Sequence, residues 1–260
     1  MDLAQYGTEK LILFLLIFVR TAGIFTLTPI FGAHQVPTHV RLAVALALTI
    51  VFVPMAAPVE GLTVEVLPLA MMVVREALVG LSIGFVISMV FSAIEMAGHI
   101  VDLNAGFAFA SLVDPTSGVN TALAGRLHNM LAGLLFFVTN SHHLMIKGLA
   151  DSFTVAPVGA LSVNPNVAGG MTELFTVLFL VAIRIAVPVM AAVFLADLAL
   201  AIAARVVPQM NVLIVGFPLK LGVGMIGMIF AMPIVAATSQ GLFGDMYRQM
   251  GSLVRLMAVH

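Results

Sequence analysis

Long apolar segments follow one another almost from end to end of this 260-residue chain, and they constrain its fold more than any other feature. They cover roughly residues 11–31, 42–57, 66–98, 119–139, 171–204 and 210–238. Several are long enough to cross about 30 Å of hydrocarbon as helices. Because a bilayer core admits only backbone whose polar groups are paired within the protein, we expect an all-α integral membrane protein built from these segments.

The composition agrees with a membrane protein and argues against other classes. Charged residues make up 9% of the chain and hydrophobic residues 62%, whereas charged residues are about 25% of a typical soluble domain. Mean hydropathy is +1.17. The formal net charge of −1 gives no reason to expect a nucleic-acid partner. Because the chain has no cysteine, disulfides and thiolate chemistry are excluded.

Ionisable side chains lie within the apolar segments, where they are least expected. They are Arg20, Arg75, Glu76, Glu95, Arg126, Arg184, Asp197 and Lys220. At the centre of a bilayer each would cost about 2.5–3.5 kcal/mol facing lipid, so each must face protein or water. A transport pathway should gather such charges at one depth on broken helices. Here they are scattered one or two to a segment, which favours burial by partner subunits, although ion pairing within the chain remains an alternative.

Two local patterns concern helix packing. Small residues recur every four positions, at Gly80, Gly84, Ser88 and Ser92, and they predict a ridge over which another helix approaches closely. Arg75 and Glu76 are adjacent, so on a helix they point about 100° apart. We therefore expect these two side chains to have separate partners.

The stretch from Gly106 to Asn120 is typical of neither a solvated loop nor a spanning helix. Its large apolar residues are Phe107, Phe109, Leu112 and Val113, and its turn-forming residues are Asp114, Pro115 and Gly118. A loop of this kind needs protein around it, because exposed backbone in hydrocarbon and exposed Phe in water are both unfavourable. It either fills a gap between helices or acts as a movable plug in a conduit.

No combination of residues indicates catalysis, a metal site or a cofactor. Gly222, Gly224 and Gly227 match the dinucleotide fingerprint in form, but they lie in apolar sequence without a preceding strand. These glycines are expected to allow close helix contact instead. The adjacent His142 and His143 point apart on a helix and have no third ligand at a useful spacing. We expect no enzyme activity.

The polar stretch 140–170 is the longest interruption of the apolar sequence, and it is the best candidate for a boundary between two parts of the chain. After Gly244 the sequence changes again. Apolar residues repeat there at helical spacing, at Met246, Met250, Leu253 and Met257, opposite a polar face with Arg248 and Arg255. This pattern predicts an amphipathic helix that lies at the membrane surface or docks on a partner.

A series of short motifs follows in order along the chain. They are Arg20 with Gly23, Pro29-Ile-Phe-Gly32 with Pro37 and Arg41, Arg75-Glu76 with Gly80 and Gly84-Phe85, Phe109 to Pro115, Asn140 to His143, and Pro208 to Asn211 followed by Gly216 to Lys220. Their joint order and spacing closely resemble the FliR/SctT family of type III secretion export gates, above all its flagellar branch. The resemblance covers nearly the whole chain.

This resemblance implies a function. FliR-like proteins join FliP and FliQ in a helical, ring-like assembly that forms the entrance of the flagellar export channel in the bacterial inner membrane, at the flagellar basal body. FlhB and FlhA lie nearby, and the substrates are unfolded flagellar proteins. Partner subunits would then cover most of the helix surface, with membrane lipid as a further neighbour, and we expect Arg20, Arg75, Glu76, Arg184, Asp197 and Lys220 to serve subunit packing.

The resemblance also implies two parts and a plug. Residues 1–170 look similar to FliP, and residues 171–260 look similar to the FliQ helical hairpin, ending in the amphipathic helix. In the family, the loop that matches residues 106–120 is the channel plug. Here Gly106 and Gly118 are expected to be its hinges, with Asp114-Pro115 forming the turn.

One departure and one alternative are relevant. Family members commonly have Gln just before the plug, where this chain has His99, Asp102 and Asn104, so polar contacts of that helix are not carried over.

The alternative function is a self-sufficient secondary transporter of a small solute. It would need binding groups at the bilayer midplane and internal repeats, and the sequence has neither in clear form.

Overall fold

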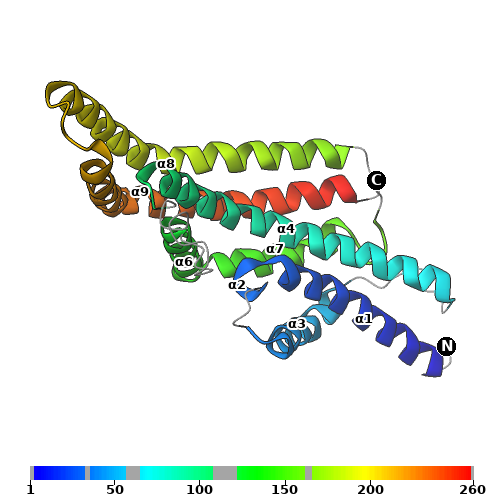
Figure 1. Ribbon diagram of the computed structural model, residues 1–260. Helices are drawn as coiled ribbons and strands as arrows, with labels where there is room; N and C mark the ends of the chain where they lie inside the picture. Colours follow the sequence, from blue (N-terminus) through cyan, green and yellow to red (C-terminus); the bar gives the residue numbers. More distant parts are fainter. Residues whose placement is uncertain (1–2, 33–35, 57–64, 108–121, 162–165, 259–260) are drawn as a thin grey trace. The chain divides into compact units, whose positions relative to one another are not determined.

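The computed structural model describes residues 3–32, 36–56, 65–107, 122–161 and 166–258, which are almost entirely helical (Figure 1). The helices are α1 (Leu3–Leu27), α2 (Pro29–Gly32), α3 (Thr38–Phe52), the 3₁₀ turn η1 (Val53–Met55), α4 (Val66–Ala105), α6 (Leu123–Val138), α7 (Ser141–Val155), α8 (Asn166–Val206) and α9 (Val212–Met257). Five of them are long and apolar enough to cross a membrane, and α6 is apolar but shorter. The predicted class, an all-α integral membrane protein, is confirmed.

The helix that was not expected is α7. Each of the six predicted apolar segments overlaps a helix, but the polar stretch 140–170 also contains one. α7 forms there because Met145, Leu149 and Phe153, at fourfold spacing, share one buried face. Polar residues between them interrupt the apolar sequence, so this stripe does not stand out as a continuous hydrophobic segment.

Helix ends coincide with the prolines, glycines and capping residues of the sequence. α1 ends two residues before Pro29, and α3 passes into a turn that contains Pro54. α4 ends at Gly106, whose φ of 84° suits only glycine without strain. At the start of α9 the side chain of Asn211 accepts a hydrogen bond from the Ile214 amide at 3.3 Å, which satisfies one of the free helix donors.

Contacts divide the chain into two compact units. Unit 1 comprises Met1–Val90, Asn140–Phe175 and Phe243–His260, and unit 2 comprises Phe91–Thr139 and Thr176–Leu242. Both ends of the chain therefore belong to unit 1, and α4, α8 and α9 each contribute a part to both units. The boundary expected at residue 170 concerns likeness to FliP and FliQ and stays a prediction.

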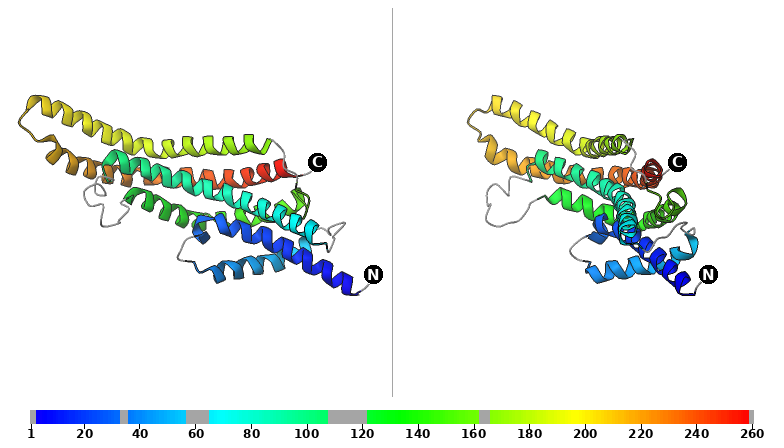
Figure 2. Two further views of the ribbon diagram at one scale, coloured as in Figure 1. Left: turned by 45° about the vertical axis from the view of Figure 1, so that its right-hand side comes forward. Right: turned by 90° about the vertical axis from the view of Figure 1, so that its right-hand side faces the viewer.

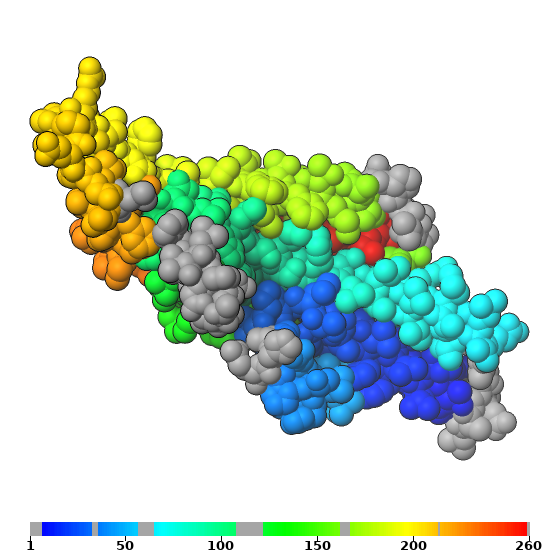
Figure 3. Space-filling model, in the orientation of Figure 1, coloured from blue at the N-terminus to red at the C-terminus, as the bar shows by residue number. Residues whose placement is uncertain are grey.

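Within unit 1, α1 packs against both α3 and α4. α1 and α3 lie side by side in both views of Figure 2, and α1 borders directly on the first half of α4 in the space-filling view (Figure 3). A Cβ atom at Gly80 would lie 2.9 Å from the carbonyl carbon of Arg20, and one at Gly84 would lie 2.9 Å from the carbonyl oxygen of Ile24. The close approach expected over this ridge occurs here with α1 as the second helix.

The other two members of the ridge do not take part in this crossing. Ser88 is half-buried and donates a hydrogen bond to the carbonyl of Phe85 in its own helix, at 3.0 Å. Ser92 is exposed and belongs to the portion of α4 in unit 2.

A fully buried ion pair joins α1 to α4. Arg20 Nε lies 2.6 Å from Glu76 Oε2, and Arg20 Nη2 donates to Glu76 Oε1 at 3.1 Å. Each side chain is only 1% exposed. Two parallel hydrogen bonds of this kind form the strong bidentate pairing of arginine with a carboxylate. Both charges therefore find partners inside the chain, which is the alternative that the sequence left open, and the role in subunit packing expected for them stays a prediction.

The same guanidinium closes the end of α7. Arg20 donates to the carbonyl oxygens of Ser152 and Ala156 at 3.0 Å, and the ring of Phe153 lies 4.5 Å away. The last carbonyls of a helix have no partner within the helix and carry partial negative charge, so a buried cation stabilises them.

Gly159, four residues after the end of α7, is held by Arg75 and Glu76 of α4. Glu76 accepts a hydrogen bond from the Gly159 amide at 2.8 Å, and Arg75 donates to the Gly159 carbonyl at 3.0 Å. Arg75 and Glu76 thus have different main partners, as their adjacency predicted, and Arg75 also finds its partner inside the chain.

The amphipathic C-terminal stretch is a continuation of α9 and belongs to unit 1. Its apolar face, with Met246, Met250, Leu253 and Met257, is buried. Met250 lies against Gly148 of α7, and Tyr247 donates a hydrogen bond to Asp151. This face therefore docks on its own chain, whereas the sequence predicted contact with the membrane surface or a partner.

Replacing Glu76 by alanine should strongly destabilise unit 1. The substitution leaves the Arg20 charge buried without its carboxylate, which typically costs about 3–5 kcal/mol. The matched control is Glu173→Ala, which removes an exposed carboxylate from the same unit and should be nearly neutral. Thermal unfolding of the purified full chain in detergent measures both, and equal midpoints for the two variants would contradict this account.

Candidate functional site at the base of the apolar loop

The apolar loop predicted as a plug lies mostly outside the described residues. This applies to Phe109, Leu112, Val113, Asp114, Pro115 and Gly118. Gly106 and Phe107 are described, and so are α4 and α6, the two helices that the loop joins. The part of α4 from Phe91 onward, Gly106, Phe107 and α6 all belong to unit 2. The candidate site is therefore the base of the loop, where the chain leaves α4 and enters α6.

At the α4 side, the chain leaves the helix over the surface of α9. Phe107 is buried, with 9% of its surface exposed. A Cβ at Gly224 of α9 would lie 3.5 Å from the Phe107 ring and 2.5 Å from the Cβ of Ala105, so only glycine fits there. The ring of Phe217 lies 3.5 Å from the Cβ position of Gly106. Gly224, from the fingerprint-like motif, thus serves close helix contact, as the sequence predicts.

At the α6 side, a carboxylate from α4 holds the first turn of the helix. Asp102 Oδ1 accepts a hydrogen bond from the Ala124 amide at 2.8 Å, and Oδ2 accepts one from the Gly125 amide at 3.0 Å. The first amides of a helix lack partners within the helix, and the residue at the start of α6, Ala122, has no capping side chain. Because Asp102 is 2% exposed, its charge is stabilised mainly by these dipoles.

Close backbone packing supports this junction. A Cβ at Gly98 of α4 would lie 2.6 Å from both Ala124 and Gly125, so the two helices meet here without intervening side chains. The ring of His99 would lie 3.0 Å from a Cβ atom at Gly125. Hence both ends of the loop are held by α4: one by continuity of the chain and the other by Asp102.

A second polar contact lies one turn further along both helices. Asn129 of α6 donates to Glu95 Oε2 of α4 at 3.2 Å, and Glu95 lies 3.7 Å from His99 on its own helix. Glu95 therefore has partners inside the unit. Arg126, on the exposed side of α6, has no side-chain partner within the described part of the chain.

Beside the base of the loop, α8 and α9 form a mostly apolar hollow of about 610 Å³. Gly106, Leu200, Val212 and Phe217 are among the residues that line it. At its edge, Lys220 Nζ of α9 lies 2.8 Å from Asp197 Oδ1 of α8. This pair is partly exposed, so Asp197 and Lys220 have each other as partners within the chain, and their expected role in subunit packing stays a prediction.

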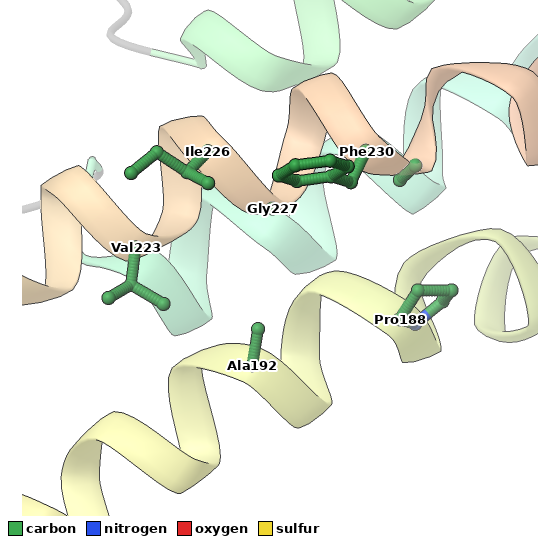
Figure 4. A pocket seen from close by; sticks show the side chains of 7 residues that line it. Pro188, Ala192, Val223, Ile226, Gly227 and Phe230 are labelled. Carbon is green, nitrogen blue, oxygen red and sulfur yellow. The ribbon is translucent and has the colours of Figure 1, made fainter.

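A smaller apolar hollow of about 260 Å³ lies further along the same two helices (Figure 4). Val223 of α9 and Ala192 of α8 point toward each other there, beside Pro188. Gly227 permits the approach, since a Cβ at this position would lie 3.3 Å from Val189. Phe230 lines the hollow although it is 78% exposed.

Arg184 differs from the other predicted charges. It is exposed on α8, and the large apolar residues around it, Leu180, Ile183 and Val187, are exposed as well. Arg184 has no side-chain partner among the residues described. The role in subunit packing that the sequence suggested for Arg184 therefore stays a prediction.

The residue that sequence analysis missed is Asp102. It was noticed only as a departure from the family pattern just before the loop. The signal in the sequence is weak: an acidic residue in an apolar segment, followed about one loop length later by a helix that starts without a capping side chain. Neither observation alone shows that Asp102 accepts a hydrogen bond from the Ala124 amide, which lies 22 residues further along the chain.

The helices and this junction define an all-α integral membrane protein whose helices hold an apolar loop at their ends. Sequence comparison gives the family: the chain belongs to the bacterial export proteins, family 1, which match residues 11–246. The resemblance stated from the motifs is thereby confirmed.

Named relatives extend over nearly the whole chain. The chain is 32% identical to the flagellar biosynthetic protein FliR of Bacillus subtilis over 249 residues, which cover 95% of this chain and 96% of the relative. It is 30% identical to FliR of Escherichia coli, with 91% and 90% covered, and 30% identical to FliR of Aquifex aeolicus, with 92% and 93% covered.

Replacing Asp102 by asparagine should loosen the start of α6. Asparagine retains one acceptor oxygen but turns an NH₂ group toward the second helix amide and removes the charge, which should cost about 1–3 kcal/mol locally. Hydrogen exchange at the amides of Ala124 and Gly125, followed by mass spectrometry of the full chain, should become faster. Asn104→Ala, at an exposed position two residues further along α4, is the control. Unchanged exchange in the Asp102 variant would show that this carboxylate does not hold α6.

Proposed function

We propose that this chain is a channel-forming subunit of the flagellar type III protein export gate in the bacterial inner membrane, at the flagellar basal body. In this role it helps unfolded flagellar proteins cross the membrane, and its apolar loop, residues 106–120, acts as a plug. Membership of the export family carries the proposal, together with the FliR relatives that match almost end to end.

The base of the loop supports the plug role. A plug has to be anchored at both ends while its middle is free to take another course, and Asp102 and the continuous chain of α4 provide two such anchors. Gly106, with its positive φ, is suited to be the hinge at the α4 side. Apolar side chains such as those at Phe107, Phe109 and Leu112 can close a narrow pore to ions by excluding water.

The exposed surface supports a role as one subunit of an assembly. Large apolar side chains are exposed along α8 and α9, and Arg184 lies among them. We propose FliP and FliQ as the chains that cover these faces, with FlhB and FlhA adjacent. In this arrangement residues 1–170 act as the FliP-like part and residues 171–260 as the FliQ-like hairpin. The role is one of transport, and it requires no catalysis.

A secondary transporter of a small solute is less well supported. Such a protein needs charged or polar groups that are available to the solute near the midplane. Arg20 and Glu76 are fully engaged with each other and with helix ends, and Asp102 is engaged with two amides. The buried charges thus have structural partners already.

Purification tests membership in the assembly. The tagged chain, expressed from its native operon and extracted in mild detergent, should carry FliP-like and FliQ-like chains in mass spectrometry of the intact complex. Arg184→Glu should reduce the recovery of these chains, because the exposed apolar face would then present the opposite charge. Arg205→Glu, at an exposed basic residue in the last turn of α8, is the matched control. A lone monomer or homodimer from the wild-type operon would instead support the transporter.

Replacing residues 107–113 with Gly and Ser should open an ion leak. The substitution removes the apolar side chains that exclude water, so membrane conductance in cells that express the assembly should rise several-fold. Asn104→Ser, an exposed position just before the loop, should leave conductance unchanged. If the loop variant assembles normally and conducts no more than wild type, residues 107–113 are not a plug.

A further inference from the structure

A polar hollow of about 340 Å³ lies in unit 1, between α7 and the end of α9. Arg248, Ser252 and Arg255 line it from α9, and Asp151 and Ser152 line it from α7. The hollow is far more polar than those between α8 and α9, and it takes no part in the export role proposed above.

The three side chains from α9 share one helix face. They are spaced by four and three residues, so they lie one above the other over about two turns. Two guanidinium groups on one face match the needs of a phosphate, which accepts several hydrogen bonds and carries negative charge. Ser252 between them lines the hollow but donates its hydroxyl proton to the Gln249 carbonyl at 2.9 Å, so the arginines are the donors that an anion would meet.

Among the charges around the hollow, Arg255 is unpaired within the described residues and Arg248 has only an exposed partner, Asp245. The carboxylate of Asp151 already accepts a hydrogen bond from Tyr247, and Asp245 pairs with Arg248 at an exposed site. That exposed pair is weak, because water competes for both partners. Arg255 is exposed and has no side-chain partner among the residues that the structure describes. Glu173 lines a separate, smaller hollow on the other flank of Ser252.

Gly251 keeps the hollow open. It lies between Arg248 and Arg255 on α9, and a Cβ at this position would meet nothing within 4 Å. A larger side chain could therefore occupy this space without disturbing the backbone. This gives a way to fill the hollow while leaving both arginines in place.

The position along the chain indicates the source of the phosphate. The hollow lies at the last turns of a helix that is long and apolar enough to cross a membrane, Ile214–Met257. Tyrosine and arginine at such a helix end typically lie at the level of the lipid headgroups. Basic pockets between helices at this level bind anionic headgroups. We propose that Arg248 and Arg255, in the hollow lined by Ser252, form a binding site for the phosphate of an anionic phospholipid.

Lipid binding to the full chain, purified with the chains that accompany it and stripped of loosely held lipid, tests this site. Native mass spectrometry after addition of phosphatidylglycerol or of phosphatidylcholine with the same acyl chains should show preferential binding of phosphatidylglycerol. The double variant Arg248→Gln with Arg255→Gln should weaken this binding by about tenfold or more. Gly251→Leu should weaken it too, by filling the hollow, whereas Arg205→Gln should not.

Several results would overturn the proposal. Equal binding of the two lipids would contradict it, and so would unchanged phosphatidylglycerol binding in the double variant. Displacement of the lipid by inorganic phosphate at equal concentration would indicate a site for the free anion instead. If the double variant does not purify, the single variant Arg255→Gln and Gly251→Leu decide the question, because each leaves the Arg248 pair intact.

Discussion

The burial of Arg20 is the interaction on which unit 1 depends. A guanidinium at 1% exposure is tolerable only when its donors and its charge are met in place. Arg20 meets the carboxylate of Glu76 on one side and the terminal carbonyls of α7 on the other, so three helices share one charge. Asp102 follows the same rule with the opposite sign, since its carboxylate satisfies the first amides of α6. In both cases a charged side chain on one helix binds the free backbone groups at the end of another helix. This contact stabilises the point where the second helix stops or starts.

Much of the fold can be predicted from the sequence, because the length of each apolar segment determines where a long helix forms. The six apolar segments, the end of a helix at Gly106 and a close helix crossing over Gly80 and Gly84 all follow from local patterns, whereas α1 as the crossing helix does not. α7 could not be found from the length of uninterrupted apolar sequence, since its apolar stripe is only one residue wide. The partners of Arg20 and Asp102 could not be found either, because the sequence names the charge but not which distant helix end it meets. For Arg20 that end lies 132 to 136 residues away.

The charges of the apolar segments therefore fall into two groups. Paired inside their own unit are Arg20, Arg75, Glu76, Glu95, Asp197 and Lys220, so they say little about partners. Arg184 and Arg126 are exposed, and nothing else in the described residues compensates them. A count of ionisable residues in the sequence treats both groups alike. Only the geometry separates the charges that are paired within this chain from those that have no side-chain partner among the described residues.

The discontinuity of unit 1 has a consequence for biosynthesis. Its first helix is made early, but Met250 and Tyr247, which cover α7 at Gly148 and Asp151, are translated only after all the other helices. Unit 1 therefore stays incomplete while the later helices are inserted. Until the ribosome has passed these residues, the α7 face at Gly148 and Asp151 stays uncovered, so this unit can close only after Tyr247 and Met250 have been made.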